Sequence, residues 1–254
     1  MPWKELTKLL VMQLGGFDEM DSSTHTALLV GPDPTNRAVP RTRIMTKTIS
    51  QILWNRDFSE QWQNHHQLFK TLSRDPRARG FLGDIFEPAF HVLCVRGADF
   101  TVYPSLCTAQ RTYYHFTNDR FNETGSEDLS LRQYSQTFFN HKTRPISDLL
   151  ANHYYQPVTL NNPSYDSFIY DANSHQISAF QVTVGKDHDL AEEGVTELCE
   201  LGRRLQINDL KIRIIVVGFE DDRVTYKIEK DLFDDLGLEV YVLHVTEDQL
   251  YRFP

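Results

Sequence analysis

The sequence predicts an α/β domain in which helices flank a mixed central sheet of about five strands, preceded by a mostly helical N-terminal region. Three observations favour this class. Apolar residues recur at helical spacing in the segment that follows Asp75. Aromatic and β-branched runs between residues 153 and 184 are typical of strands. The run LKIRIIVVGF, residues 210–219, is apolar enough to form a central strand that is covered on both faces.

Residues 1–73 are expected to form the N-terminal region, and residues 74–254 the α/β domain. Residues 3–14 have the apolar period of a short amphipathic helix, and residues 46–74 have helical spacing in two pieces that break near Asp57. Between these helices, THTALLV is expected to be a strand and GPDPTNRAVP a loop.

The helix of the second domain is expected to begin at Asp75, which precedes a proline at the first helical position. Its apolar positions continue to Leu93, and Gly97 should end it. Pro88 lies inside this pattern and should kink or restart the helix. We expect the break to turn Glu87 toward the strands, although it could instead only bend the helix around the sheet.

The remaining segments alternate between strands and one further helix. Residues 117–150 are polar and irregular, so an insertion that could hold one helix is expected there. Asp189 and Glu192 have capping-box spacing, which predicts a helix from Asp189 to about residue 206. The other strands are expected at residues 99–106, 110–116, 153–158, 164–171, 176–184, 223–228 and 238–245.

Charge and composition limit the classes of function. The formal net charge of −9 gives no attraction of the whole surface to nucleic acid, so such a partner would need a local basic patch. Three widely spaced cysteines favour reduced thiols in an intracellular setting, and neither a signal peptide nor a membrane-spanning run is visible. The candidate basic groups are Arg74, Arg77, Arg79, Lys142, Arg144, Arg203 and Arg204.

One polar constellation remains after the phosphate-loop, dinucleotide-binding, zinc-protease and serine-hydrolase motifs are found to be absent. It consists of Glu87, Asp166, Gln181 and Thr183. Gln181 and Thr183 should share one face of a strand, and a hairpin through DANSH would bring Asp166 beside Gln181. A second interpretation stays open, in which the glutamine and threonine bond each other or the backbone, and the aspartate caps a turn.

The segments GFLGDIFEPAFHVL, YYQP, YDSFI and FQVTVGKDHDL, in this order, resemble the restriction-endonuclease-like (PD-(D/E)xK) domain of Crinkler-type effector proteins, which has relatives in fungal and retrotransposon-hot-spot proteins. The likeness covers roughly residues 70–246 and implies a restriction-endonuclease-like core. The upstream run SSTHTALLVGPDPTNR is similar to the segment that precedes this domain, commonly behind a nucleoside-triphosphatase module. The phosphate loop of that module is absent from this sequence.

The resemblance also implies roles for the constellation. In these nucleases two acidic groups hold Mg²⁺, a lysine acts on the attacking water, and a helix glutamate assists. Asp166 matches the first metal ligand and Glu87 the helix glutamate, while Gln181 stands in the second acidic place and Thr183 in the place of the lysine. A neutral amide in a ligand position should weaken the binding of Mg²⁺ or Mn²⁺. A fully degenerate site would hold no metal.

Two further residues could complete such a site. Lys186 could supply the missing cation if Gly185 bends the chain, and it could equally be a solvated loop lysine. His188 could contact a phosphate or a metal-bound water, or it could simply lie between Asp187 and Asp189 at the start of a helix.

These observations lead to a nuclease hypothesis and two alternatives. The first is a Mg²⁺-dependent nuclease-like domain of a Crinkler-type effector that acts on DNA, bound through a local basic patch, in the nucleus of a host. The second is a catalytically reduced nuclease fold that binds nucleic acid or a host nuclear protein. The third is a purely structural α/β partner domain. No membrane partner is expected, and the sequence decides neither catalysis nor oligomeric state.

Overall fold

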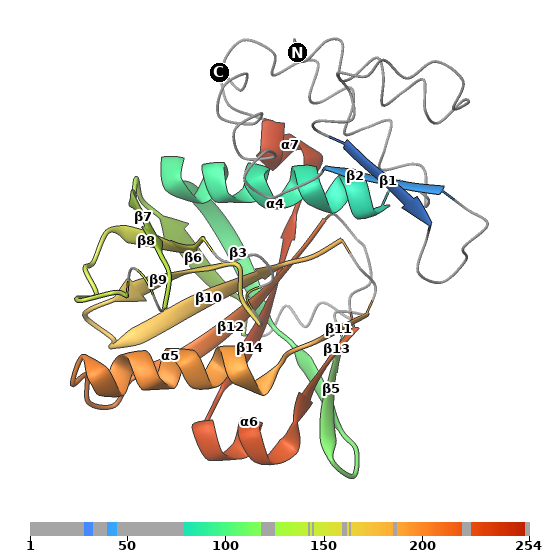
Figure 1. Ribbon diagram of the computed structural model, residues 1–254. Helices are drawn as coiled ribbons and strands as arrows, with labels where there is room; N and C mark the ends of the chain where they lie inside the picture. Colours follow the sequence, from blue (N-terminus) through green and yellow to red (C-terminus); the bar gives the residue numbers. More distant parts are fainter. Residues whose placement is uncertain are drawn as a thin grey trace. The chain divides into compact units, whose positions relative to one another are not determined.

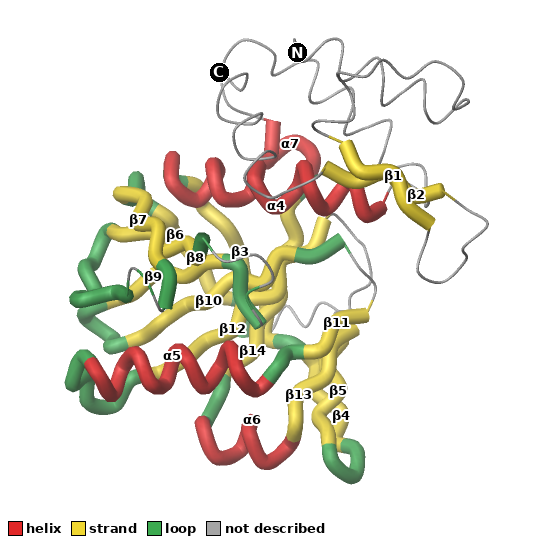
Figure 2. Tube along the Cα trace, viewed as in Figure 1, coloured by secondary structure: helices red, strands yellow, loops and turns green. Residues whose placement is uncertain are grey.

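Figures 1 and 2 show the computed structural model of the chain. It divides into two compact units, residues 1–89 with 247–254, and residues 90–246. The domain boundary predicted at residue 74 stays a prediction. The described residues are 28–32, 40–44, 79–117, 125–141, 143, 145–158, 162, 164–184, 187–219 and 225–251.

The first unit contains a two-stranded antiparallel sheet of β1 (Leu28–Pro32) and β2 (Pro40–Ile44), together with α7 (Glu247–Tyr251). Helix α4 (Arg79–Arg96) begins in this unit and ends in the second. The strand predicted at THTALLV overlaps β1, whereas β2 has no counterpart among the predicted elements. The helices predicted within residues 3–14 and 46–74 lie outside the described residues.

A large curled sheet dominates the second unit (Figure 1). In spatial order its strands are β6 (Glu127–Leu131), β3 (Ala98–Pro104), β14 (Glu239–Val245), β12 (Lys211–Phe219), β10 (Gln176–Val182), β9 (Ser167–Asp171), β8 (His153–Pro157) and β7 (Ser135–Phe139). Strands β10, β12 and β14 are mutually parallel, as are β7 and β8, and the other neighbours are antiparallel.

A smaller four-stranded sheet and two helices complete the second unit. The sheet has the order β11 (Asp187–Asp189), β13 (Thr225–Glu229), β5 (Tyr113–Thr117) and β4 (Leu106–Ala109). The helices are α5 (Glu192–Arg204) and α6 (Lys230–Leu236). No helix in the described part of the chain is long and apolar enough to cross a membrane.

The predicted fold class is wrong. The described residues form a mostly-β domain with an eight-stranded curled mixed sheet and a second sheet, and not a restriction-endonuclease-like α/β core of about five strands flanked by helices. Strands β6 and β7 arise from residues 117–150, which were expected to be an irregular insertion. Both lie at edges of the sheet, where a strand has one neighbour and mostly exposed side chains, so its apolar pattern is weak. Strand β13, expected to help close the main sheet, belongs to the smaller one.

The centre of the large sheet agrees with the sequence. Strand β12 lies between β10 and β14, and its last six residues are all buried, as the apolar run predicts. The hairpin of β9 and β10 lies next to it, with Phe168 opposite Ala179. Residues of α5, including Val195 and Leu198, share one apolar cluster with both strands. In the part of α4 that belongs to this unit, Phe90 makes an edge contact with Phe180, with ring centroids 5.5 Å apart.

The N-terminal end of α5 differs from the prediction. Asp189 ends strand β11, and the N-cap of the helix is Ala191, which makes no side-chain cap hydrogen bond. Pairing of β11 with β13 removes Asp189 from the cap position, so the capping box does not form. Acidic residues in the first turn and basic residues in the last turn still favour the helix dipole: Glu192, Glu193, Arg203 and Arg204.

Helix α4 runs without interruption from Arg79 to Arg96, so Pro88 does not restart it. Gly97 ends it, as expected, with a φ of +93° and with its amide donating to the carbonyls of Leu93 and Cys94. A Cβ atom on Gly97 would lie 2.9 Å from the carbonyl oxygen of Leu131, which is backbone and cannot rotate away.

Replacement of Gly97 by alanine should therefore lower the free energy of unfolding by about 3 kcal/mol, from left-handed strain and a backbone clash together. Gly237 is the matched control, since it also has a positive φ, +56°, but a Cβ atom added to it would meet no other atom within 4 Å. Gly237→Ala should cost about 1 kcal/mol. Urea unfolding of both variants measures the difference, and equal losses would contradict the proposed clash.

Candidate functional site

The carboxylate of Asp166 lies where the hairpin of β9 and β10 opens. Ser167 is paired with Phe180, so one step further along the register Asp166 faces Gln181. The Asp166 amide donates to the Phe180 carbonyl at 2.7 Å. Its side-chain Oδ2 accepts hydrogen bonds from the Val182 amide at 2.8 Å and from Gln181 Nε2 at 3.0 Å. The approach of Asp166 to Gln181 that the sequence predicts is therefore confirmed.

The carboxylate takes the place of a backbone acceptor. Strand β9 begins at Ser167, which is paired with Phe180, so the backbone pairing ends two residues before Val182. A buried amide needs an acceptor, and Asp166 Oδ2 supplies it from the side chain. Only 8% of Asp166 and 6% of Gln181 is exposed, so both groups are held inside the protein. A hydrogen bond to an ionised acceptor is among the stronger kinds.

The side-chain oxygen of Gln181 is buried and has no hydrogen-bond partner among the described residues. Its amide nitrogen donates to Asp166, and because both atoms belong to one planar group, this bond also fixes where the oxygen points. A buried acceptor without a donor costs about 1–3 kcal/mol. The site therefore contains an oxygen that could bind a cation or accept a hydrogen bond, on a side chain whose nitrogen is bonded to a carboxylate.

Thr183 follows the end of β10, and its amide donates to the Val217 carbonyl at 2.9 Å. Thr183 is 8% exposed and is therefore buried, two residues after Gln181 in the sequence. The Gln181 side chain donates its hydrogen bond to Asp166, and not to Thr183 or the backbone as the second interpretation of the sequence proposed. The predicted role of the Thr183 hydroxyl stays a prediction.

The other three predicted site residues come from other segments of the chain. Glu87 is half-buried in the part of α4 that belongs to the first unit, and its predicted approach to Asp166 stays a prediction. Lys186 lies outside the described residues. The backbone of His188 lies in β11, opposite Tyr226 of β13, and thus belongs to the smaller sheet.

The donors at the hairpin suit a hard cation. In the described part of the chain, no group of three or more histidine, cysteine, aspartate or glutamate side chains is placed to hold a metal. Asp166 and Gln181 offer one charged and one neutral oxygen, and oxygen is the donor that Mg²⁺ and Mn²⁺ prefer. A site with one carboxylate leaves most of the coordination sphere to water or to a substrate.

Sequence reasoning missed a buried hydrogen-bonded chain of side chains next to this hairpin. The Tyr154 hydroxyl lies 2.6 Å from Ser167 Oγ and 2.7 Å from Nδ1 of His91. All three residues are at most 3% exposed. Burial, followed by the nearby Cys94, raises the pKa of Tyr154 well above its ordinary value, so its hydroxyl stays protonated. The run YYQP, which contains Tyr154, does not predict these hydrogen bonds, because the three residues come from separate segments of the sequence.

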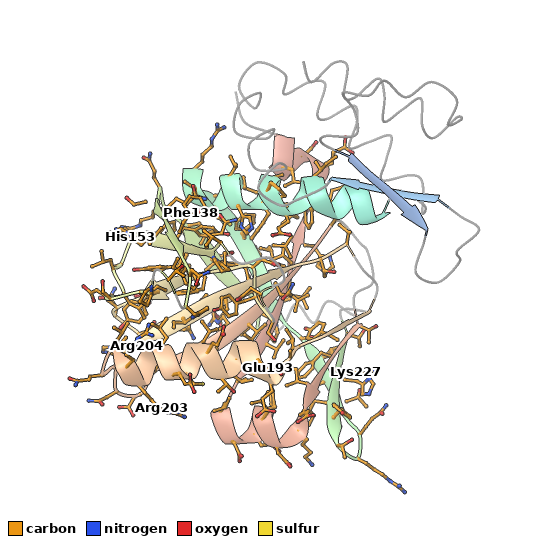
Figure 3. The ribbon with its side chains drawn as sticks, in the orientation of Figure 1. Phe138, His153, Glu193, Arg203, Arg204 and Lys227 are labelled. Carbon is orange, nitrogen blue, oxygen red and sulfur yellow. The ribbon has the colours of Figure 1, made fainter. Side chains whose placement is uncertain are left out.

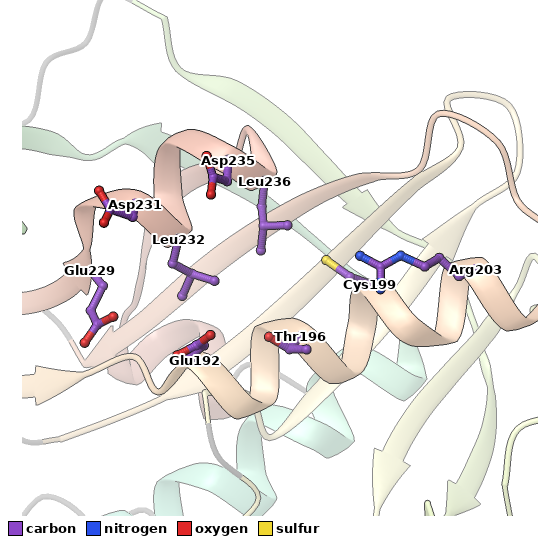
Figure 4. Close-up of a pocket in the computed structure, with 9 residues that line it drawn as sticks. All are labelled: Glu192, Thr196, Cys199, Arg203, Glu229, Asp231, Leu232, Asp235 and Leu236. Carbon is purple, nitrogen blue, oxygen red and sulfur yellow. The ribbon is translucent and has the colours of Figure 1, made fainter.

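A pocket of about 260 Å³ lies between α5 and α6, apart from the predicted site residues (Figure 4). Four carboxylates face it, and Arg203 is the only basic residue among the described residues of its lining. Such a surface repels phosphate, so the pocket does not suit a nucleic-acid backbone. The lining residues are Glu192, Thr196, Cys199, Arg203, Glu229, Asp231, Leu232, Asp235 and Leu236.

The basic groups considered for a DNA-binding patch are described only in part. Arg203 and Arg204 are exposed at the C-terminal end of α5 (Figure 3). The Arg204 guanidinium also donates to the Ile146 carbonyl at 3.0 Å, which connects the end of the helix to the segment between β7 and β8. The side chains of Arg74, Arg77, Arg79, Lys142 and Arg144 lie outside the described residues.

Comparisons of the chain with protein-family models, with curated proteins and with solved structures find no match. Its function is therefore inferred from the geometry of Asp166 and Gln181.

The variant Gln181→Glu should be less stable than the wild type when no metal is present. It places a second carboxylate beside Asp166, and repulsion between two buried carboxylates raises the pKa of the pair above the values in the unfolded chain. Raised folded-state pKa values keep stability at low pH and lose it as pH rises. We expect a loss of about 2 kcal/mol at pH 8 and a smaller loss at pH 5.

Gln176→Glu is the matched control, because Gln176 is on the same strand and also donates to a carboxylate, Glu239 Oε2, at 3.4 Å, but at an exposed position. Solvent screening should limit its effect to about 0.5 kcal/mol. Urea unfolding in the presence of a chelator measures both variants. A loss for Gln181→Glu that is independent of pH would contradict the buried pair.

Proposed function

We propose that the Asp166–Gln181 pair holds a divalent cation, Mg²⁺ or Mn²⁺, and that the chain acts as a metal-dependent nuclease on DNA. The observation that carries the proposal is the buried carbonyl oxygen of Gln181, which has no partner among the described residues and is fixed in place beside the Asp166 carboxylate. The order of the segments that resembles the nuclease domains of Crinkler-type effectors supplies the substrate class.

The two residues fit the cation through their chemistry. Asp166 contributes the negative charge, and the Val182 amide holds its Oδ2 against β10. Gln181 contributes a neutral carbonyl oxygen, which lowers affinity relative to a second carboxylate. Mg²⁺ is commonly bound through one or two carboxylates together with waters and substrate phosphate. Binding should therefore be weak in the free protein and stronger when DNA supplies phosphate oxygens.

The protein groups and the metal would divide the hydrolysis between them. A bound divalent cation activates water and neutralises negative charge on the phosphate. Thr183 follows Gln181 along the chain and can orient water through its hydroxyl, but it carries no positive charge. One charged side chain, Asp166, and one neutral one, Gln181, would hold the cation, and Thr183 would orient water beside it.

A second function is favoured by one observation: among the described residues, no group of three or more histidine, cysteine, aspartate or glutamate side chains is placed to hold a metal. In that case the domain would bind nucleic acid or a nuclear protein without cleaving it, and the Gln181 oxygen would accept a hydrogen bond from the partner. The two functions differ in their dependence on a metal.

Asp166→Ala should abolish both metal binding and cleavage, because it removes the charge that holds the cation. Gln181→Glu should tighten Mn²⁺ binding about tenfold by adding a second charge, in line with charge-assisted bonds being about 1.5–3 kcal/mol. Calorimetric titration with Mn²⁺, with and without DNA, and a plasmid-nicking assay measure these changes.

Asp171→Ala is the control, since Asp171 is an exposed carboxylate at the other end of β9 that accepts hydrogen bonds from Ser174 and Asn173 of the adjacent turn. It should leave metal binding and nicking unchanged. Nicking that persists in Asp166→Ala would show that the activity comes from a contaminant. Absence of Mn²⁺ binding by the wild type and by Gln181→Glu, even with DNA, would favour the metal-independent binding function.

A further inference from the structure

The buried side chains of Tyr154, Ser167 and His91 connect strand β8, strand β9 and helix α4 within the second unit. Tyr154 is fully buried, and its hydroxyl is the middle member of this series of hydrogen-bonded side chains. It lies 2.6 Å from Ser167 Oγ and 2.7 Å from His91 Nδ1. Its ring also packs against Phe180, with centroids 6.3 Å apart. One hydroxyl group thus joins three elements.

This chain of hydrogen bonds ends at the residue next to Asp166. Ser167 is the first residue of β9 and is paired with Phe180, whose carbonyl accepts the Asp166 amide. The Asp166 backbone is joined to Ser167 by the peptide bond and to Phe180 by a hydrogen bond. Tyr154 contacts both of these residues, Ser167 through its hydroxyl and Phe180 through its ring. The negative charge of Asp166 is also near enough to contribute to the raised pKa of Tyr154, after burial and Cys94.

We propose that Tyr154 is a positioning residue that fixes the Asp166 carboxylate against the Val182 amide, acting through Ser167. The consequence for cation binding rests on the proposed function, whereas the positioning itself concerns only the protein. Asp166 Oδ2 can accept its two hydrogen bonds only while the Asp166 backbone keeps its place. The Asp166 amide is bonded to Phe180, and the regular ladder with β10 begins at the next residue, Ser167, which Tyr154 contacts.

A general structural role for Tyr154 makes a different prediction. Loss of its hydroxyl leaves buried polar groups of Ser167 and His91 with one partner fewer, which lowers the stability of the whole unit. In that case every protected amide of the sheet would exchange faster by a similar factor. A positioning role predicts faster exchange at Val182 in particular, because the acceptor of that amide is the Asp166 side chain.

The test compares Tyr154→Phe with Tyr155→Phe by amide hydrogen exchange, followed by NMR. Tyr155 is the matched control, since it is the next residue of the same strand, is 2% exposed, and uses its hydroxyl on Leu150 and Asp148, away from β9. Exchange at Val182 is measured relative to Ile215, a fully buried residue in the middle of β12. We expect this ratio to rise about tenfold in Tyr154→Phe, the size of one lost hydrogen bond, and to be unchanged in Tyr155→Phe.

Ser167→Ala serves as a second variant, because it removes the hydrogen bond between Tyr154 and the start of β9 from the serine side and leaves the tyrosine hydroxyl in place. It should reproduce the tenfold rise. Equal acceleration of Val182 and Ile215, or the same effect in both tyrosine variants, would overturn the proposal.

Titration with Mn²⁺ alone separates this proposal from the proposed function. If the wild type binds Mn²⁺, the affinity of Tyr154→Phe should be about tenfold lower, matching the lost orientation of Asp166. If the exchange ratio rises as expected and the wild type binds no Mn²⁺, then the positioning role holds and the metal site is refuted. Equal Mn²⁺ affinity of the wild type and Tyr154→Phe would refute the consequence for the cation.

Discussion

The burial of strand β12 on both faces is the constraint on which the second unit depends. A strand that is apolar on both sides needs a neighbour at each edge and cover above and below, and β10 and β14 supply the edges by parallel pairing. Parallel neighbours require long crossover connections. The connection from β10 to β12 contains β11 and α5, and the one from β12 to β14 contains β13 and α6. The smaller sheet follows, because β11 and β13 pair with each other.

The polar groups at the end of the β9–β10 hairpin are an exception within this apolar core. Asp166 satisfies the Val182 amide where the backbone pairing stops, so its burial serves the fold. The Gln181 oxygen makes no hydrogen bond among the described residues, so its burial lowers the stability of the fold. Functional sites are where such a loss of stability is expected. The two side chains are hydrogen-bonded to each other, and the proposed ligand concerns the oxygen of Gln181.

The distribution of charge restricts how a nucleic acid could approach. Along α5, acidic residues gather at the N-terminal end and basic residues at the C-terminal end, an arrangement that the helix dipole favours. The acidic end also lines the pocket beside α6, which therefore disfavours phosphate. Arg203, which also lines this pocket, and Arg204 lie at the other end of the same helix. With a net charge of −9, a surface that bound DNA would have to be a local basic patch.

The sequence by itself determined the central position of β12, the β9–β10 hairpin, the end of α4 at Gly97 and the approach of Asp166 to Gln181. These features follow from apolar runs, turn residues and alternation, which are local. Only the tertiary structure decided that β6 and β7 extend the sheet, that β11 takes Asp189 out of a helix cap, and that the Gln181 oxygen has no partner among the described residues. Edge pairing and side-chain orientation depend on residues far apart in the chain, so no local pattern contains them.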